Sequence, residues 1–254
     1  MRLTLPVPPD RYKSPPQRAR IATELWAALN LYCANCHSNR LRQAAANHPA
    51  IDYFCQNCEA PFQLKSQSRP FGRRILDAAY STMIRAIRED RTPNLLALHY
   101  DREAWSVRNL FLIPRFAYSE SAIECRKPLG PAAQQAGWVG CYIRLDLLPP
   151  DVRIPLVLDG ASYEAREVRR MFARIRPLEK LRAKQRGWTL DVLTAIRSLG
   201  KGEFSLADAY SLEANLSKLH PENRHVRDKI RQQLQVLRDR GLLAFVSPGR
   251  YRLG

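Results

Sequence analysis

Short apolar runs recur through the first two thirds of the chain, and their length and composition predict strands of a sheet. These runs occupy residues 94–100, 108–115, 141–148 and 154–160. Two further apolar and aromatic runs, at residues 50–54 and 62–65, are separated by a C-x-x-C turn and predict a hairpin.

Helical spacing of apolar residues marks the segments between these runs. The first segment starts at Arg18, with Ile21, Leu25, Ala28 and Leu29 at helical spacing. A second helix is predicted to run from just after Arg74 to about Glu89, and basic helical sequence covers residues 164–185. Residues 1–17 hold several prolines and predict an extended arm. Together these elements predict an α/β core in which helices flank a mixed sheet.

The pattern changes after residue 186, where three helices are predicted at residues 188–199, 205–219 and 222–240. The third helix places Val226, Ile230, Leu234 and Leu237 on one face and ends at Gly241, a natural C-cap. A hairpin follows over residues 242–253. Three helices and a hairpin predict an α+β winged-helix domain. We therefore expect two domains, residues 1–185 and residues 186–254.

The charge of the chain indicates its partner. Lys plus Arg is 41 and Asp plus Glu is 24, which gives a net charge of +17 in 254 residues. Such an excess indicates a polyanion, and nucleic acid is the simplest one, because no strongly amphipathic basic helix with aromatic anchors suggests a membrane surface. There is no run of eighteen apolar residues and no signal peptide at the start, so we expect a cytoplasmic protein.

Four cysteines have the spacing of a zinc site. Cys33 and Cys36 form one C-x-x-C pair, and Cys55 and Cys58 form the next after a gap of eighteen residues. Four thiolates fill a tetrahedral zinc and leave no position for water, so the predicted metal is structural. His37 and His48 lie between the pairs and could replace a cysteine, although four cysteines already suffice. Cys125 and Cys141 stand alone and are expected to be buried apolar side chains.

Asp52, Gln63 and Lys65 lie on the predicted hairpin around the second cysteine pair. Residues at i and i+2 of a strand face the same side, so Gln63 and Lys65 point together, and the hairpin can bring Asp52 opposite them. Two oxygen ligands and an ammonium could form a magnesium-dependent phosphodiesterase site. This pattern is common in proteins that are not nucleases. The zinc site and the basic charge are what support the hypothesis of a phosphodiesterase site here.

The chain resembles the DpnI family of methyl-directed restriction endonucleases over nearly its whole length. The resemblance rests on YKSPPQRARIATELW, CANC, CQNCEAPFQLKS, RKPLGPAAQQAGWVGC, RGWTLDVL and KIRQQLQVLRD. It implies a PD-(D/E)xK-type nuclease domain with zinc, followed by a winged helix. It also implies magnesium-dependent cleavage of GATC that carries N6-methyladenine. Gln63 stands where the family has an acid, and Glu24 is a secondary metal-site candidate or a solvent-facing residue.

The residues expected to contact DNA fall in three places. Trp138 lies in a glycine-containing loop, where it could be a core residue, but the resemblance favours contact with DNA near the methylated adenine. Arg and Gln side chains read base edges in the major groove, although some arginines could touch only phosphate. The candidates on the third helix are Arg224, Arg227, Arg231 and Gln232, and Arg250 and Arg252 on the wing are expected to contact the DNA backbone. Arg69, Arg73 and Arg74 are candidates for phosphate contact or are simply solvated.

Two functions follow from these observations. The first is an endonuclease that cleaves double-stranded DNA at methylated GATC, with magnesium as cofactor and no obligate protein partner. The alternative is a zinc and winged-helix protein that binds methylated DNA and has lost the ability to cut, which Gln63 keeps open. An RNA nuclease is less favoured, because a helix with Arg and Gln suits the major groove of duplex DNA.

Overall fold

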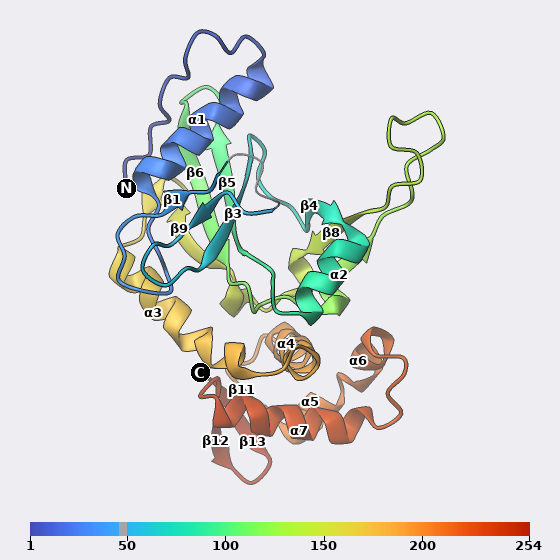
Figure 1. Cartoon of the computed structure of the whole chain (residues 1–254). Helices are drawn as coiled ribbons and strands as arrows, with labels where there is room; N and C mark the ends of the chain where they lie inside the picture. The colour runs from blue at the N-terminus through green and yellow to red at the C-terminus, as the bar shows by residue number, and fades with distance from the viewer. Residues whose placement is uncertain (46–49) are drawn as a thin grey trace. The chain divides into compact units, whose positions relative to one another are not determined.

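The computed structural model describes residues 1–45 and 50–254 and divides into two compact units. The first unit comprises Met1–Gly72, Pro93–Arg115 and Arg153–Ala173. The second comprises Arg73–Thr92, Phe116–Val152 and Arg174–Gly254. Among the described residues, no helix is long and apolar enough to cross a membrane. Figure 1 labels most of the helices and strands of both units.

A mixed sheet of seven strands forms the centre of the first unit, in the order β1-β2-β3-β5-β6-β9-β10 within the part of the chain described. The strands are β1 (Arg42–Gln43), β2 (Tyr53–Phe54), β3 (Pro61–Gln67), β5 (Asn94–Asp101), β6 (Ser106–Ile113), β9 (Ile154–Leu158) and β10 (Ala161–Ser162). The pair β3 and β5 is parallel, while the other neighbours are antiparallel. The predicted mixed sheet is confirmed.

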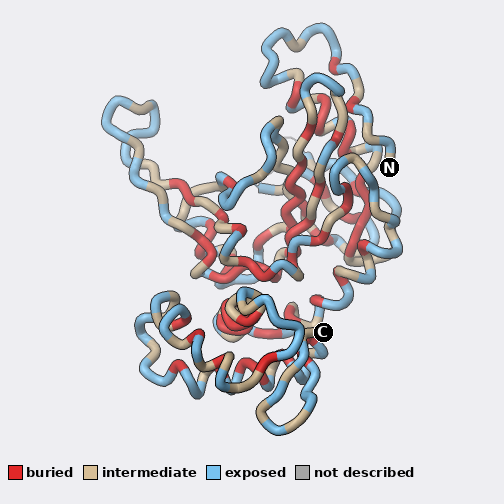
Figure 2. The backbone as a smooth tube through the Cα atoms, turned by 180° about the vertical axis from the view of Figure 1, so that it is seen from behind, coloured by how far each residue is buried: buried red, intermediate tan, exposed pale blue. Residues whose placement is uncertain are grey.

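The core of this unit lies in the strands that the apolar runs predicted. Leu95, Leu98, Leu110 and Leu112 are at most 1% exposed. Figure 2 shows that the central strands of the sheet are mostly buried. A strand flanked by neighbours on both edges and covered on both faces needs a nearly continuous apolar sequence, and β5 has one.

Helix α1 (Pro15–Asn30) packs against β3, and its predicted start is wrong. The helix begins at Pro15 rather than Arg18, because the Ser14 side chain accepts a hydrogen bond from the Gln17 backbone and caps it. Its buried face consists of Ala19, Ala22, Thr23, Trp26 and Ala27. Leu25 is 41% exposed and Leu29 is 75% exposed. Small residues allow the helix to lie close to the sheet, which larger leucines on the same face would prevent.

The second unit contains a three-stranded antiparallel sheet, in the order β4-β8-β7. Its elements are β4 (Arg74–Ala79), α2 (Tyr80–Arg88), β7 (Ile123–Cys125) and β8 (Gly140–Arg144), with 3-10 turns at Glu120–Ala122, Leu145–Leu147 and Pro150–Val152. The prediction that the helix starts just after Arg74 is wrong. Residues 74–79 form a strand, since Ile75 pairs with Ile143 of β8 and both are buried.

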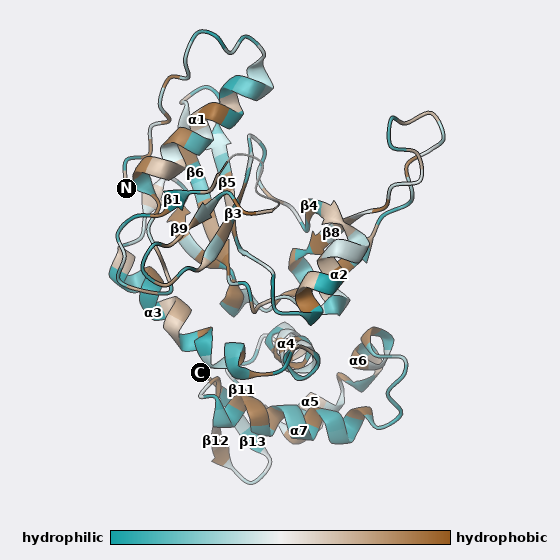
Figure 3. Ribbon diagram, viewed as in Figure 1, coloured by the Kyte–Doolittle hydropathy of each residue, from teal (hydrophilic) through white to brown (hydrophobic). Residues whose placement is uncertain are grey.

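The winged helix follows α3 (Ala165–Ile175) and a 3-10 turn at Arg176–Lys180. It consists of α4 (Ala183–Ser198), β11 (Glu203–Ser205), α5 (Leu206–Tyr210), α6 (Glu213–Leu219), α7 (Val226–Asp239), β12 (Leu243–Ser247) and β13 (Arg250–Leu253). The predicted second helix is two short ones, and β11 joins the hairpin as a third strand in the order β11-β13-β12. Figure 3 shows hydrophobic and hydrophilic residues mixed along α7. Its four predicted apolar positions are buried, as expected.

Helix α4 connects the winged helix to the rest of the second unit. Arg186 is 2% exposed and forms an ion pair with Asp90, while its Nη1 donates to the Leu181 carbonyl. Further along the helix, Arg197 pairs with Asp151, with Nε 2.8 Å from Oδ2. The expected domain boundary, between residues 185 and 186, falls inside this helix, which begins at Ala183.

Candidate functional site

The four predicted zinc ligands lie together in the first unit. All four Sγ atoms are within 4.8 Å of one another, with Cys33 and Cys58 3.6 Å apart and Cys36 and Cys55 3.5 Å apart. Zinc bound by thiolates at about 2.3 Å places neighbouring sulfurs about 3.8 Å apart, so the cluster fits a tetrahedral zinc. His37 is exposed and outside the cluster, and His48 lies outside the described residues.

An arginine from α3 holds the first turn of this cluster. Arg169 donates from Nε to the Cys33 carbonyl at 3.1 Å and from Nη2 to the Ser38 carbonyl at 2.9 Å. Its guanidinium also lies over the Tyr32 ring, 5.3 Å from the centroid. Because Arg169 is 136 residues away from Cys33 along the chain, no local pattern could have predicted this contact.

The hairpin of β2 and β3 brings the three predicted catalytic residues together. Tyr53 pairs with Phe62, and the Asp52 backbone N–H donates to the Phe62 carbonyl at 2.9 Å. One step further in this register, Asp52 is opposite Gln63, and Gln63 shares a face of β3 with Lys65. Asp52 Oδ2 also accepts a hydrogen bond of 2.7 Å from the backbone N–H of Leu64, which fixes the carboxylate beside both positions.

The surroundings of Asp52 raise the pKa of its carboxyl group above the usual value. The main cause is partial removal from water, although Asp52 keeps an exposed surface. The negative charge of Glu24 acts in the same direction, whereas the Leu64 N–H and the positive charge of Lys65 lower the pKa. A bound cation stabilises the ionised form of such a carboxyl group. This is the electrostatic character of a metal site.

Glu24 is positioned by α1 as part of the same group. Its side chain accepts a hydrogen bond of 2.7 Å from Arg20, and its backbone carbonyl accepts one of 2.9 Å from the Tyr53 hydroxyl. At the preceding residue, the Thr23 hydroxyl lies 3.0 Å from the Ser66 hydroxyl and ties α1 to β3. Carboxylate and amide oxygens suit a hard divalent cation such as Mg²⁺, so Glu24, Asp52 and Gln63 are chemically suited to hold one.

Helix α7 presents Arg227, Arg231 and Gln232, whereas Arg224 lies in the turn before it, because the helix begins at Val226 and not at the predicted residue 222. Arg224, Arg227, Arg231 and Gln232 are all exposed. They differ in what they already bind: Arg227 pairs with Glu213 at 2.7 Å, and Gln232 Oε1 accepts a hydrogen bond of 2.8 Å from Lys229. On the wing, Arg250 is exposed, and Arg252 lies 3.6 Å from Glu203.

Trp138 lies near the end of the loop at residues 126–139, which connects β7 to β8. Backbone hydrogen bonds join the two sides of this loop. The Leu129 N–H donates to the Trp138 carbonyl and the Gly137 N–H donates to the Leu129 carbonyl, each at 2.9 Å. The Trp138 ring is half-buried and covers Gly140, where a β-carbon would lie 2.6 Å from the ring. Trp138 is thus neither a core residue nor a freely moving one.

The three arginines expected near the active site differ in their surroundings. Arg69 and Arg73 are exposed. Arg74 pairs with Glu124 at 3.2 Å and lies over the Tyr142 ring, so this side chain already has an acidic and an aromatic partner.

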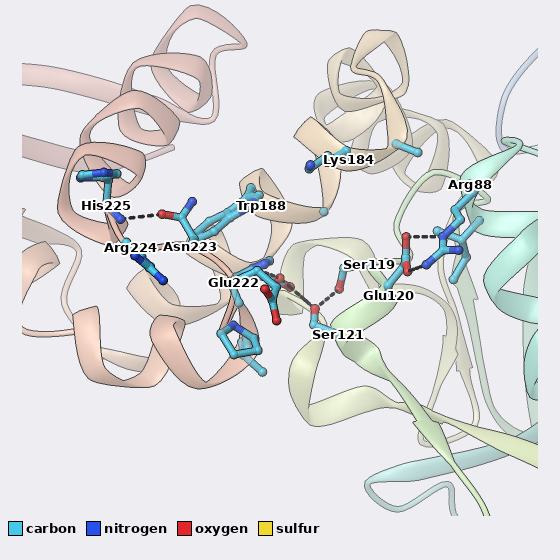
Figure 4. Close-up of a pocket in the computed structure, with 17 residues that line it drawn as sticks. Arg88, Ser119, Glu120, Ser121, Lys184, Trp188, Glu222, Asn223, Arg224 and His225 are labelled. Carbon is cyan, nitrogen blue, oxygen red and sulfur yellow. Dashed lines mark hydrogen bonds and ion pairs between the residues drawn. The ribbon is translucent and has the colours of Figure 1, made fainter.

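A cavity of 940 Å³ in the second unit involves residues that the sequence did not single out (Figure 4). Beside it, Ser121 Oγ donates to the buried carboxylate of Asp191 at 2.7 Å, and His220 Nε2 lies 2.8 Å from the same group. The His220 ring stacks on Trp188 with centroids 3.5 Å apart. These residues come from three distant segments, so neither spacing nor composition pointed to them.

The fold and these residues define a class of protein: a mixed α/β domain with a four-cysteine cluster suited to zinc, followed by a helix-turn-helix domain. Residues 7–181 match the DpnI family, described as the Dam-replacing family, and residues 184–253 match the Dam-replacing helix-turn-helix domain. The chain belongs to the DpnI family. This membership indicates a restriction endonuclease, and the helix-turn-helix domain indicates that it binds DNA.

Proposed function

We propose that this protein is a type II restriction endonuclease that cleaves double-stranded DNA at GATC when the adenine carries an N6-methyl group. The observation that carries the proposal is the placement of the Asp52 carboxylate, bonded to the backbone between Gln63 and Lys65. The net charge of +17 suits a DNA substrate. Because that substrate is DNA, we also propose that the protein acts in the cytoplasm.

The proposed catalytic residues divide the work of phosphodiester hydrolysis. Asp52 and Gln63 would hold Mg²⁺, and Glu24 would add a second carboxylate. The bound cation would lower the pKa of a water molecule and offset charge on the scissile phosphate. Lys65 would orient the attacking water and stabilise the negative charge that develops on the phosphate oxygens. The Leu64 N–H keeps the Asp52 carboxylate in one orientation while it binds.

Recognition is proposed to involve contacts with base edges and contacts with phosphates. Arg231 and Gln232 would approach base edges in the major groove, where Arg pairs with guanine and Gln with adenine. Arg224, Arg227 and Arg250 would contribute base or phosphate contacts, and Trp138 would contact DNA near the methylated adenine. The zinc would only hold the hairpin in place. We further propose that residues 1–185 act as the nuclease domain and residues 186–254 as the winged-helix domain.

A cleavage assay tests this function. Two plasmids that differ only in adenine methylation at GATC are incubated with the full chain and magnesium. Cutting of the methylated plasmid alone, lost in Asp52→Ala and Lys65→Ala, is the expected result. Binding that depends on methylation without cutting would favour the alternative of a nuclease that has lost activity. Equal cutting of both plasmids would contradict the methyl-dependent specificity.

A further inference from the structure

Cys125 and Cys141 face each other across two strands of the second unit. They are cross-strand partners in β7 and β8, two positions from the buried pair Ile123 and Ile143. Since alternate residues of a strand share a face, both cysteines point to the side of the sheet that carries these isoleucines. Cys141 is buried as expected, whereas the expectation for Cys125 is wrong, because it lies at the end of an edge strand and is exposed.

The backbone hydrogen bonds define the type of pair that the two cysteines form. The next pair along, Arg126 and Gly140, is joined by a bond of 3.0 Å from the Arg126 N–H to the Gly140 carbonyl. Hydrogen-bonded and non-hydrogen-bonded pairs alternate in an antiparallel ladder, so Cys125 and Cys141 form a non-hydrogen-bonded pair. Cα atoms in such pairs are about 4.5 Å apart. This separation is within the range of about 4.4–6.8 Å that a disulfide bridges.

Each thiol makes a weak contact of its own. Cys141 Sγ lies 3.3 Å from the Ala78 carbonyl, and Cys125 Sγ lies 3.5 Å from the Arg126 carbonyl. Cys125 is the solvent-accessible member and Cys141 the sheltered one.

We propose that Cys125 and Cys141 are a redox modification site and form a disulfide when the protein meets a peroxide. The Cys125 sulfur attacks one peroxide oxygen and the O–O bond breaks, which gives a sulfenic acid and, with hydrogen peroxide, water. The Cys141 sulfur then attacks the Cys125 sulfur, the S–O bond breaks, and the departing hydroxide leaves as water with the Cys141 proton. Two thiols are oxidised and one peroxide is reduced.

This disulfide would close the base of the loop at residues 126–139. Trp138 covers Gly140, the residue next to Cys141, so the position of the ring depends on the backbone that the disulfide holds. Oxidation therefore alters how the loop presents Trp138. This consequence rests on the proposed contact of Trp138 with DNA, whereas formation of the disulfide does not.

Peptide mapping tests the disulfide directly. The zinc-loaded full chain is treated with hydrogen peroxide, its remaining thiols are alkylated, and it is digested with trypsin. The two cysteines fall in separate peptides, residues 116–126 and 127–144, and the four zinc cysteines fall in others. A linked pair of these peptides that disappears on reduction and is absent in Cys125→Ser is the expected result. Recovery of both cysteines in unlinked peptides, free or singly oxidised, would overturn the proposal.

A binding measurement tests the effect on the loop. Affinity for a methylated GATC duplex is compared in reduced and peroxide-treated protein, with Cys125→Ser as the matched control. Oxidation is expected to weaken binding several-fold in the original chain and not in the variant. If the oxidised protein contains the disulfide but binds the duplex as tightly as the reduced protein, the proposed effect on Trp138 is overturned. If the reduced protein does not distinguish methylated from unmethylated DNA, the proposed function fails, while the peptide map still decides the disulfide.

Discussion

The carboxylate of Asp52 accepts a hydrogen bond from the backbone N–H of Leu64 at 2.7 Å, and Leu64 stands between Gln63 and Lys65. The zinc-associated hairpin thus connects its two strands through a side chain as well as through the ladder. A carboxylate held in this way keeps its orientation whether or not a cation is bound.

The raised pKa of Asp52 leads to a prediction about stability and pH. Its folded-state pKa lies above the unfolded value, so ionisation destabilises the folded protein as pH rises through the folded pKa. Asp52→Asn removes this cost and keeps an oxygen that can accept from Leu64. Without magnesium but with zinc retained, we therefore expect the variant to melt at a higher temperature than the original chain at pH 7, with the difference shrinking toward pH 3. Thermal unfolding across this range measures it, and the variant should not cut DNA. A lower melting temperature at pH 7 would contradict the assignment.

The amide at position 63 is expected to set the magnesium requirement. Gln63→Glu supplies a second formal charge beside Asp52 and should lower the magnesium concentration that gives half-maximal cutting. Gln63→Leu removes the ligand oxygen at similar volume and should abolish cutting. Magnesium titrations of the plasmid assay compare the three proteins. Equal requirements in all of them would show that residue 63 is not a ligand.

Removal of zinc is expected to unfold the hairpin that carries Asp52. Zinc would join the turn that carries Cys33 and Cys36 to the turn that carries Cys55 and Cys58, and metal binding to such sites contributes directly to folding. A chelator, or Cys55→Ser, should lower the melting temperature and abolish cutting even with magnesium present. Metal analysis should find one zinc per chain in the original protein and less in the variant. Cys125→Ser serves as a control that retains the metal.

Two arginines of α7 should differ in their importance for DNA binding. Arg231 has no ion pair within the described residues, whereas Arg227 is already paired with Glu213 at 2.7 Å and lies over the Tyr210 ring. An arginine that must leave a partner gains less from DNA. Arg231→Ala should cost about 1–3 kcal/mol of binding free energy if it reads a base edge, and Arg227→Ala less. Binding to methylated duplexes at several salt concentrations measures both effects.

The sequence predicted best what depends on short stretches of chain. The zinc cluster follows from two C-x-x-C turns, and the arrangement of Gln63 and Lys65 follows from the two-residue repeat of a strand. The buried face of α7 follows from helical spacing. In each case the geometry is local, and the rest of the fold changes it little.

The sequence failed where distant packing decides the outcome. Leu29 has helical spacing with other apolar residues of α1, but it is exposed, because a different face, mostly of small residues with Trp26, packs against β3. Residues 74–79 appeared helical, and pairing with β8 makes them a strand. Arg169 reaches the zinc turn from far along the chain, and Asp191 joins Ser121 and His220 only in the folded protein.

The ion pairs of α4 bear on how this architecture could have arisen. A DNA-binding domain that is exchanged between proteins needs a surface that makes no specific contacts with the rest of the protein. In α4, Arg186 and Asp191 are each 2% exposed and find Asp90 and Ser121 outside the winged helix. A transplanted winged helix would carry Arg186 into a new protein without Asp90, at a cost of several kcal/mol for an unmatched buried charge, and Asp191 would keep His220 but lose the hydrogen bond from Ser121. The two halves of this chain are therefore expected to be inherited together rather than exchanged as separate parts.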